Sequence, residues 1–179
     1  MLLDGGLSTA LERLGHNLNT SLWSGELLRT APDQIEAAHK AFIDAGAQII
    51  ITSSYQISMD GCAKRGWTEQ DVRDALLLST ELARNAAAGT KTLVAASVGP
   101  YGASLADGSE YRGNYGKSKA ELKDFHRMRL HVLSESHPDL LAIETIPEIK
   151  EAEAILELLQ EQDIKIPFWV TFSCKDDLH

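Results

Sequence analysis

Residues 47–56 read AQIIITSSYQ, and this stretch decides the fold. Ile49 to Ile51 form an apolar run. The run comes after a helical pattern that ends at Gly46, and a polar segment comes after the run. Strands whose apolar character is nearly continuous are typical of parallel sheets, in which both faces are buried. We therefore predict a buried parallel strand over residues 47–51, which ends at residues 52–56.

The same order of apolar strand, polar or glycine-bearing turn and helix repeats along the chain. Strands are expected at residues 2–3, 47–51, 92–98, 139–143 and 167–172. Helices are expected from about residue 8 and over residues 32–45, 69–88, 118–136 and 148–162, two of them with capping boxes at Thr68/Asp71 and Ser118/Glu121. This alternation predicts an α/β fold with a parallel sheet. Two architectures fit the length of the chain. One is a five-stranded doubly wound sheet. The other is the first five strands and four βα units of a (β/α)8 barrel, because a whole barrel needs roughly 250 residues.

Composition narrows the functional class. The 179 residues are 44% hydrophobic and 24% charged, as in globular proteins, which excludes a disordered chain or a coiled coil. No signal peptide and no apolar run of about 20 residues is recognisable, so we expect a cytoplasmic protein. Two cysteines, Cys62 and Cys174, exclude a disulfide framework. A net charge of −9 without a basic run argues against nucleic acid and membrane partners.

Polar residues follow every predicted strand, and function gathers at the carboxyl ends of parallel strands. They are Asp4, Gly5 and Gly6; Thr52, Ser53, Ser54 and Gln56; Ser97 and Gly99; Glu144 and Thr145; and Ser173, Lys175 and Asp176. The acids Asp4 and Glu144 are the most informative pair, because a carboxylate there binds an ammonium group or accepts a proton. Glycine amides after Asp4 can meet a ligand carboxylate. Together these groups suit an amino acid zwitterion.

Structural roles remain open for the same residues. Asp4 is a common turn former before glycines, Glu144 could pair with an Arg or Lys, and the hydroxyls of residues 52–54 could be satisfied within the strand end. The loop over residues 99–116 lacks the spacing of a phosphate-binding loop and is interpreted as an active-site cover. His39 is expected on a helix surface. His126 and His131 are five residues apart, which disfavours a metal pair.

Six blocks of the sequence resemble the homocysteine S-methyltransferases, most closely the branch that uses S-methylmethionine or S-adenosylmethionine as donor. They occur in order along the whole chain as LLDGG (2–6), ITSSYQ (51–56), SVGPYGA (97–103), ADGSEYRG (106–113), LLAIETIP (140–147) and FWVTFS (168–173). The resemblance implies a (β/α)8 barrel and methyl transfer to the homocysteine thiolate, which gives methionine. It also implies a zinc ion, held by three cysteines, that binds the homocysteine sulfur.

The resemblance assigns roles residue by residue. Asp4, Gly5 and Gly6 match the first-strand motif of the homocysteine site, with Thr52 and Ser53 beside it. Glu144, followed by Thr145, matches the glutamate that holds the homocysteine ammonium. Tyr101 and Tyr111 match blocks near the donor side.

The family's zinc-ligand motifs, Asn-Cys and Gly-Gly-Cys-Cys, do not occur in this sequence, so no metal ligand is assigned. We therefore expect residues 1–179 to be the N-terminal part of one homocysteine-binding barrel domain, inactive alone and self-associating through open sheet edges. A non-catalytic homocysteine-binding or amino-acid-binding partial barrel is the alternative. A different barrel enzyme, an aldolase or hydrolase with Asp4 or Glu144 as general base, is the third hypothesis. Schiff-base chemistry at Lys175 is considered with it, but Lys175 is interpreted as a surface lysine because nothing in the sequence shows it buried.

Overall fold

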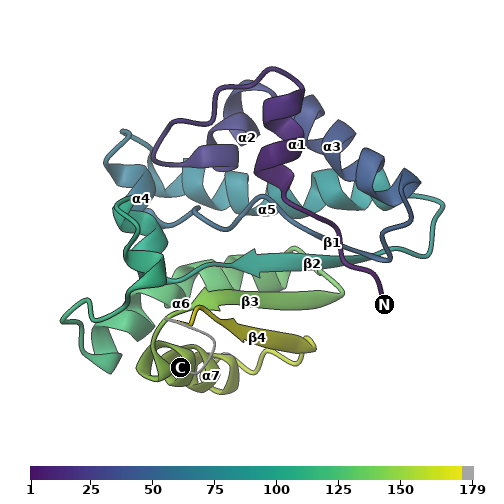
Figure 1. Cartoon of the computed structure of the whole chain (residues 1–179). Coiled ribbons are helices and arrows are strands. Elements are labelled where there is room, and N and C mark those ends of the chain that lie inside the picture. The colour runs from purple at the N-terminus through teal and green to yellow at the C-terminus, as the bar shows by residue number, and fades with distance from the viewer. Residues whose placement is uncertain (175–179) are drawn as a thin grey trace.

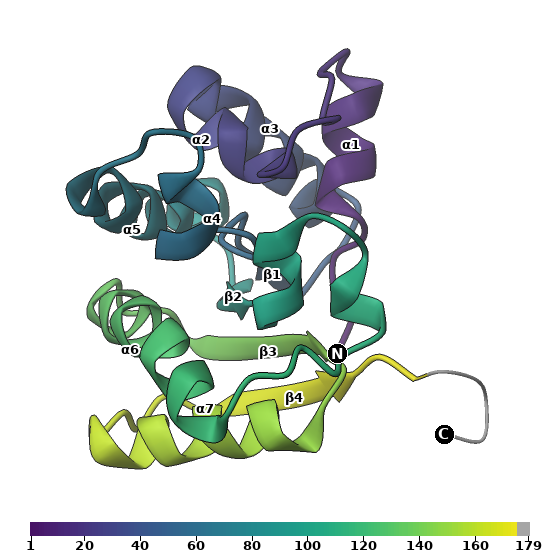
Figure 2. The ribbon, with the colours of Figure 1, turned by 90° about the vertical axis from the view of Figure 1, so that its left-hand side faces the viewer.

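The computed structural model describes residues 1–174 and contains one four-stranded parallel sheet. Its strands are β1 (Ile49–Ile51), β2 (Leu93–Val98), β3 (Leu140–Ile146) and β4 (Phe168–Phe172), and each pairs with the next along the chain. Figure 2 shows β3 and β4 running in the same direction. The predicted parallel α/β fold is therefore confirmed.

The predicted strand at residues 2–3 is shortened to a single parallel bridge between Leu3 and Ile49. The Asp4 amide still donates to the Ile49 carbonyl, at 2.9 Å. Gly5 and Gly6 follow directly, and the chain turns into the first helix before a ladder can extend. The N-terminus thus lies beside β1 without adding a full strand to the sheet.

Helices fill the connections between the strands. They are α1 (Leu7–Arg13), α2 (Leu27–Thr30), α3 (Pro32–Asp44), α4 (Met59–Ala63), α5 (Glu69–Ala87), α6 (Lys119–Glu135) and α7 (Ile149–Glu161). Both predicted capping boxes form, at Thr68/Asp71 and at Ser118/Glu121. In Figure 1, α1, α3 and α5 lie above the strands and α7 lies below them. Short 3-10 turns are η1 (Trp23–Glu26), η2 (Tyr101–Leu105) and η3 (Ser109–Tyr111). No helix within residues 1–174 is long and apolar enough to span a membrane.

The core includes side chains from both faces of the sheet: Ile50 packs with residues of α5, and Ile49 packs with Ala95 and Ala142 of the neighbouring strands. Ile49 and Ile50 point to opposite faces, yet both are buried, as are Val94 and Ala95 of β2. This confirms that β1 is covered on both faces. Burying both faces of a strand is what makes its sequence read as an apolar run rather than an alternation.

The prediction that His39 lies on a helix surface is wrong. Its exposed fraction is 0%, and burial lowers its pKa to about 4. The reason is that α3 packs against α1 as well as α5, so it buries more than the single face that helical periodicity indicates.

The strand β3 is longer than predicted and irregular at its end. It continues past Ile143 to Ile146, and its register against β4 shifts between these two residues. Thr145 has a positive φ of 60° within this irregularity. Such irregularities redirect side chains at a strand end, and here the affected residues include Glu144, one of the two acids singled out in the sequence.

Candidate functional site

Asp4 and Glu144 line one cavity of about 190 Å³ at the carboxyl ends of the strands. Its walls come from the N-terminal turn, η1, the segment after β1 and the end of β3. The lining residues are Asp4, Gly5, Leu7, Ser8, Trp23, Ser24, Ile51, Thr52, Ser53, Tyr55, Gln56 and Glu144. The structure thus brings together two carboxylates that are far apart in the sequence.

Asp4 is more than a turn former. Its Oδ2 accepts a hydrogen bond from the Ile51 amide at 2.8 Å, which ties the N-terminal turn to the end of β1. Burial raises the pKa of Asp4 to about 6, and the negative charge of Glu144 adds to this rise, whereas the Ile51 hydrogen bond opposes it. A cation that binds beside this carboxylate stabilises its ionised form.

Glu144 is held by a hydroxyl group. Ser97 Oγ, at the end of β2, donates to Glu144 Oε1. Burial raises the pKa of Glu144, and the Ser97 hydrogen bond lowers it in part. Within residues 1–174 no Lys or Arg forms an ion pair with Glu144, so the structural ion-pair role finds no partner in the described chain.

The hydroxyls that follow β1 divide into two kinds. Thr52 Oγ1 accepts from the Ser97 amide at 3.0 Å, and Ser54 Oγ donates to the Ser97 carbonyl at 2.8 Å. These two hydroxyls have the structural role considered from the sequence. Ser53 Oγ is buried and has no hydrogen-bond partner among the described residues, although Ser53 lines the cavity. It is therefore available to a ligand.

The two glycines after Asp4 lie in different surroundings. Gly5 lines the cavity, whereas Gly6 borders a separate hollow and its carbonyl accepts from the Ala10 amide. In the part of the chain that the structure describes, neither the Gly5 nor the Gly6 amide donates to another group. Both N–H groups are thus free to meet an anionic ligand group.

The predicted donor-side tyrosines do not line the cavity. Tyr101 packs its ring against Phe125 and Tyr115, at centroid distances of 5.0 and 5.2 Å. Tyr111 is exposed in η3. Thr145 does not line the cavity either, but it lies beside Tyr55, which does. The predicted strand-end residues Lys175 and Asp176 lie outside the described residues.

Two aromatic residues that the sequence analysis did not single out form part of the wall. Trp23 has a positive φ of 46° in η1, and Tyr55 follows β1; burial raises the pKa of the Tyr55 hydroxyl. The block ITSSYQ contains Tyr55, so its strand-end position was a usable signal. Nothing in the sequence around Trp23 predicts its backbone conformation, because an aromatic residue rarely adopts positive φ.

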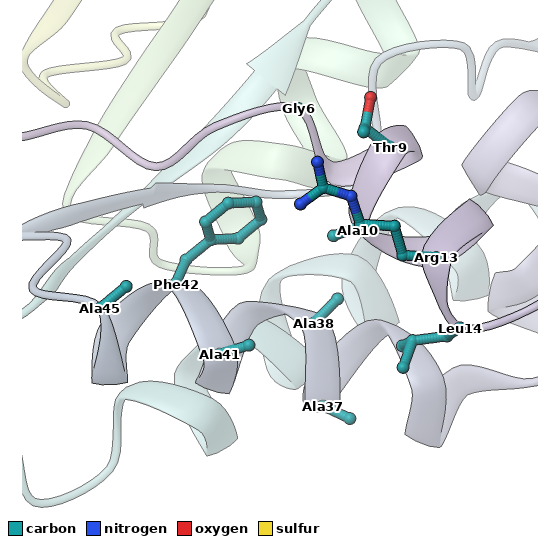
Figure 3. Close-up of a pocket in the computed structure, with 10 residues that line it drawn as sticks. All are labelled: Gly6, Thr9, Ala10, Arg13, Leu14, Ala37, Ala38, Ala41, Phe42 and Ala45. Carbon is teal, nitrogen blue, oxygen red and sulfur yellow. The ribbon is translucent and has the colours of Figure 1, made fainter.

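A larger hollow of about 550 Å³ lies between α1 and α3. Figure 3 shows Phe42 projecting from α3 toward the segment at Gly6, with a row of alanines along the same helix. Arg13 is the charged residue among its lining residues, and no carboxylate joins it there. The smaller cavity, where carboxylates, free amides and an unpaired hydroxyl converge, is therefore the better candidate for chemistry.

Metal ligands do not gather in the described chain. Among residues 1–174 no three His, Cys, Asp or Glu side chains come close enough to form a metal site. Cys62 is buried and burial raises its pKa to about 11, which disfavours the thiolate that zinc binds. The residues that the structure describes therefore do not fit a zinc ion.

Comparison with known proteins assigns the family. A family profile described as homocysteine S-methyltransferase matches residues 1–179. The chain is 46% identical to homocysteine S-methyltransferase 2 of Zea mays and to homocysteine S-methyltransferase YbgG of Bacillus subtilis; each match covers all of this chain but only 57% and 60% of the relative. The metallated form of the homocysteine methyltransferase MmuM from Escherichia coli superposes with a TM-score of 0.93 at 44% identity, over 100% of this chain and 65% of that one. This chain belongs to the homocysteine S-methyltransferase family.

Proposed function

We propose that the cavity between Asp4 and Glu144 binds homocysteine for methyl transfer. The observation that carries this proposal is the convergence of two half-buried carboxylates on one small cavity beside the free Gly5 amide. The ammonium group of homocysteine would lie between the two acids, and its carboxylate would meet the Gly5 amide. The ammonium group thereby contacts negative charge, and the carboxylate contacts the positive end of a backbone N–H dipole.

The electrostatics of the cavity support a cationic ligand group. Two neighbouring half-buried carboxylates disfavour each other's charge, and this repulsion contributes to the raised pKa of Asp4. An ammonium group between the two carboxylates offsets their repulsion and replaces part of the hydration that they lose on burial. The site therefore favours an amino acid over a neutral or anionic molecule of the same size.

The reaction we propose moves a methyl group from S-methylmethionine or S-adenosylmethionine to the homocysteine sulfur, giving methionine. The thiol first loses its proton to solvent, because the thiolate is the nucleophile. The new S–CH3 bond forms as the bond from the methyl carbon to the sulfonium sulfur breaks, and the donor leaves as a neutral thioether. This step depends mainly on alignment of the two sulfurs. Trp23 and Tyr55 line the cavity and carry aromatic rings, and the face of an aromatic ring attracts a cation such as a sulfonium.

The described residues contribute binding and orientation to this reaction. The family resemblance implies zinc as the group that activates the homocysteine sulfur, but residues 1–174 contain no fitting ligand set. We propose that the four strands belong to a (β/α)8 barrel and that residues 1–179 form the N-terminal part of that single domain. The match to only 57–60% of the relatives' length supports this. We accordingly propose that the 179-residue chain is inactive in methyl transfer by itself.

A non-catalytic homocysteine-binding protein is the second candidate. The missing ligand set in the described residues favours it, while the cavity is the same in both proposals. Transfer assays with S-methylmethionine and with S-adenosylmethionine, run with and without added zinc, test both candidates, because each predicts no turnover by the 179-residue chain. Turnover by the 179-residue chain would contradict both the inactive fragment and the non-catalytic binder.

Calorimetric titration with L-homocysteine tests the binding proposal. We expect saturable binding, and we expect Glu144→Gln to weaken it by about 2 kcal/mol, the scale for unpairing a charged hydrogen-bonded group. Glu153→Gln is the matched control, because Glu153 is an exposed acid that pairs with Lys119 on the helix surface. Equal affinities for wild type and Glu144→Gln would reject the assigned role of Glu144.

A further inference from the structure

A chain of buried polar side chains connects α6 and α7. Arg129 donates to His126 Nδ1 at 2.9 Å, and His126 Nε2 lies 2.8 Å from Glu151 Oε1. A guanidinium only donates, so Nδ1 must accept, and the ring hydrogen therefore resides on Nε2 and is donated to Glu151. The exposed fractions are 0% for His126 and Glu151 and 1% for Arg129. We call these three residues the relay.

Both ends of the relay hold backbone groups of the loops that follow the strands. Glu151 Oε1 accepts from the Tyr101 amide at 2.5 Å. Arg129 donates to the Gly99 carbonyl and, at 3.4 Å, to the Tyr55 carbonyl. Gly99 and Tyr101 follow β2, whereas Tyr55 follows β1. One relay thus fixes the loops of two neighbouring strands to each other and to the helices.

Tyr55 is where the relay meets the candidate site, because this residue lines the cavity. Gly99 packs directly on it: a Cβ at Gly99 would lie 2.6 Å from the Tyr55 carbonyl oxygen and 2.7 Å from its Cδ2. The position of Tyr55 is therefore set by Arg129 through the backbone and by Gly99 through close packing.

Stability alone does not explain the relay. Burying an arginine and a glutamate costs hydration that their attraction only partly returns, and apolar residues of similar size often serve a core equally well. The relay instead fixes loop geometry, because Arg129 donates to two loop carbonyls and Glu151 accepts from a loop amide. We propose that Arg129, His126 and Glu151 are positioning residues that hold Tyr55 against the homocysteine cavity. This inference rests on the function proposed above.

Fluorine NMR of protein labelled with 3-fluorotyrosine reports the position of Tyr55. The chain has four tyrosines, so the spectrum is simple and Tyr55→Phe assigns the relevant signal. His126→Leu breaks the relay, whereas the amide of His126→Gln can accept from Arg129 and donate to Glu151. We expect the leucine variant to shift the Tyr55 signal and to weaken homocysteine binding about tenfold, and the glutamine variant to restore both. The control is Arg127→Gln, an exposed residue of the same helix, which should leave both unchanged.

Several results would overturn the inference. A folded His126→Leu variant with the wild-type Tyr55 signal and wild-type affinity would do so. If that variant does not fold, Arg129→Lys takes its place, and an unshifted Tyr55 signal contradicts the proposal. In the wild type, nitrogen NMR must show neutral His126 with its hydrogen on Nε2; a hydrogen on Nδ1 excludes the relay. If wild type binds no homocysteine, the proposed function fails, while the fluorine signals still decide whether the relay positions Tyr55.

Discussion

The Asp4 carboxylate accepts a hydrogen bond from the Ile51 amide at 2.8 Å, so the N-terminal turn is fixed to the end of β1. This bond places Gly5 and the free carboxylate oxygen of Asp4 beside the cavity that Glu144 reaches from β3. The candidate site therefore depends on three separate parts of the chain, and substitutions in each part have different expected effects.

Homocysteine binding should depend on pH through Asp4. The pKa of Asp4 is raised to about 6 in the free protein, and a bound ammonium stabilises the ionised form. Affinity should therefore rise as pH increases from 5 to 7 and then level off, until the ammonium itself deprotonates. Calorimetry across this range measures the profile, and Asp4→Asn should bind more weakly and lose most of the rise. A profile that is flat in the wild type would contradict the assignment.

Acid should destabilise the fold through His39. Its pKa is about 4 in the folded state against an ordinary value of 6.5, because the buried imidazole is disfavoured as a cation. A depressed histidine pKa means that stability is fully present above pH 6.5 and falls progressively as pH decreases toward 4. The total loss is on the order of 3 kcal/mol. Urea unfolding at pH 7 and pH 4.5 measures it.

The matched comparison for this prediction uses two substitutions. His39→Leu should remove part of the stability difference between the two pH values, since no imidazole remains at position 39 to be protonated in the unfolded chain. His131→Gln is the control, because His131 is exposed on α6. If His39→Leu retains the full wild-type difference, His39 is not its source.

Two glycines should respond differently to substitution. A Cβ at Gly5 would lie 3.1 Å from Cε1 of the Phe42 ring, which can shift, so Gly5→Ala should impair homocysteine binding with a stability loss of about 1 kcal/mol. A Cβ at Gly102 would lie 2.5 Å from the backbone nitrogen of Glu110, so Gly102→Ala should lower stability by about 2 kcal/mol or more. Thermal unfolding and calorimetry separate these effects. A collapse of stability in Gly5→Ala would assign Gly5 a structural role instead.

The isolated chain should self-associate through β4. This strand lies at one edge of the sheet and exposes Phe168 and Phe172 by 46% and 50%. Exposed apolar residues on an open strand edge favour pairing with another chain. Light scattering should show concentration-dependent assemblies, which Phe172→Lys reduces. A monodisperse wild-type monomer at high concentration would reject this expectation.

Local signals in the sequence predicted the elements that depend on neighbouring residues. The capping boxes at Thr68 and Ser118 satisfy backbone amides within one helical turn, so three or four residues are enough to recognise them. Asp4 and Glu144 were recognisable because each follows a predicted strand, and parallel strands gather their carboxyl ends at one edge. Their common cavity was therefore a reasonable expectation before the structure was known.

Other features arise only from tertiary packing. His126 and Glu151 are 25 residues apart on different helices, and no spacing rule joins them. His39 is buried because a second helix covers α3, which its own periodicity does not indicate. Trp23 reaches the cavity through a backbone conformation that its sequence does not favour. Each of these depends on neighbours that are brought close only by folding.

The most direct measurement is an amide NMR titration of the isotope-labelled chain with L-homocysteine. The proposed site predicts saturable shifts at Gly5, Gly6 and Ser53, because their N–H groups lie at or beside the bound amino acid. The same titration of Glu144→Gln should need a higher ligand concentration to reach the same shifts. Shifts confined to the hollow between α1 and α3, at Ala37 and Ala41, or no shifts at all, would contradict homocysteine binding between Asp4 and Glu144.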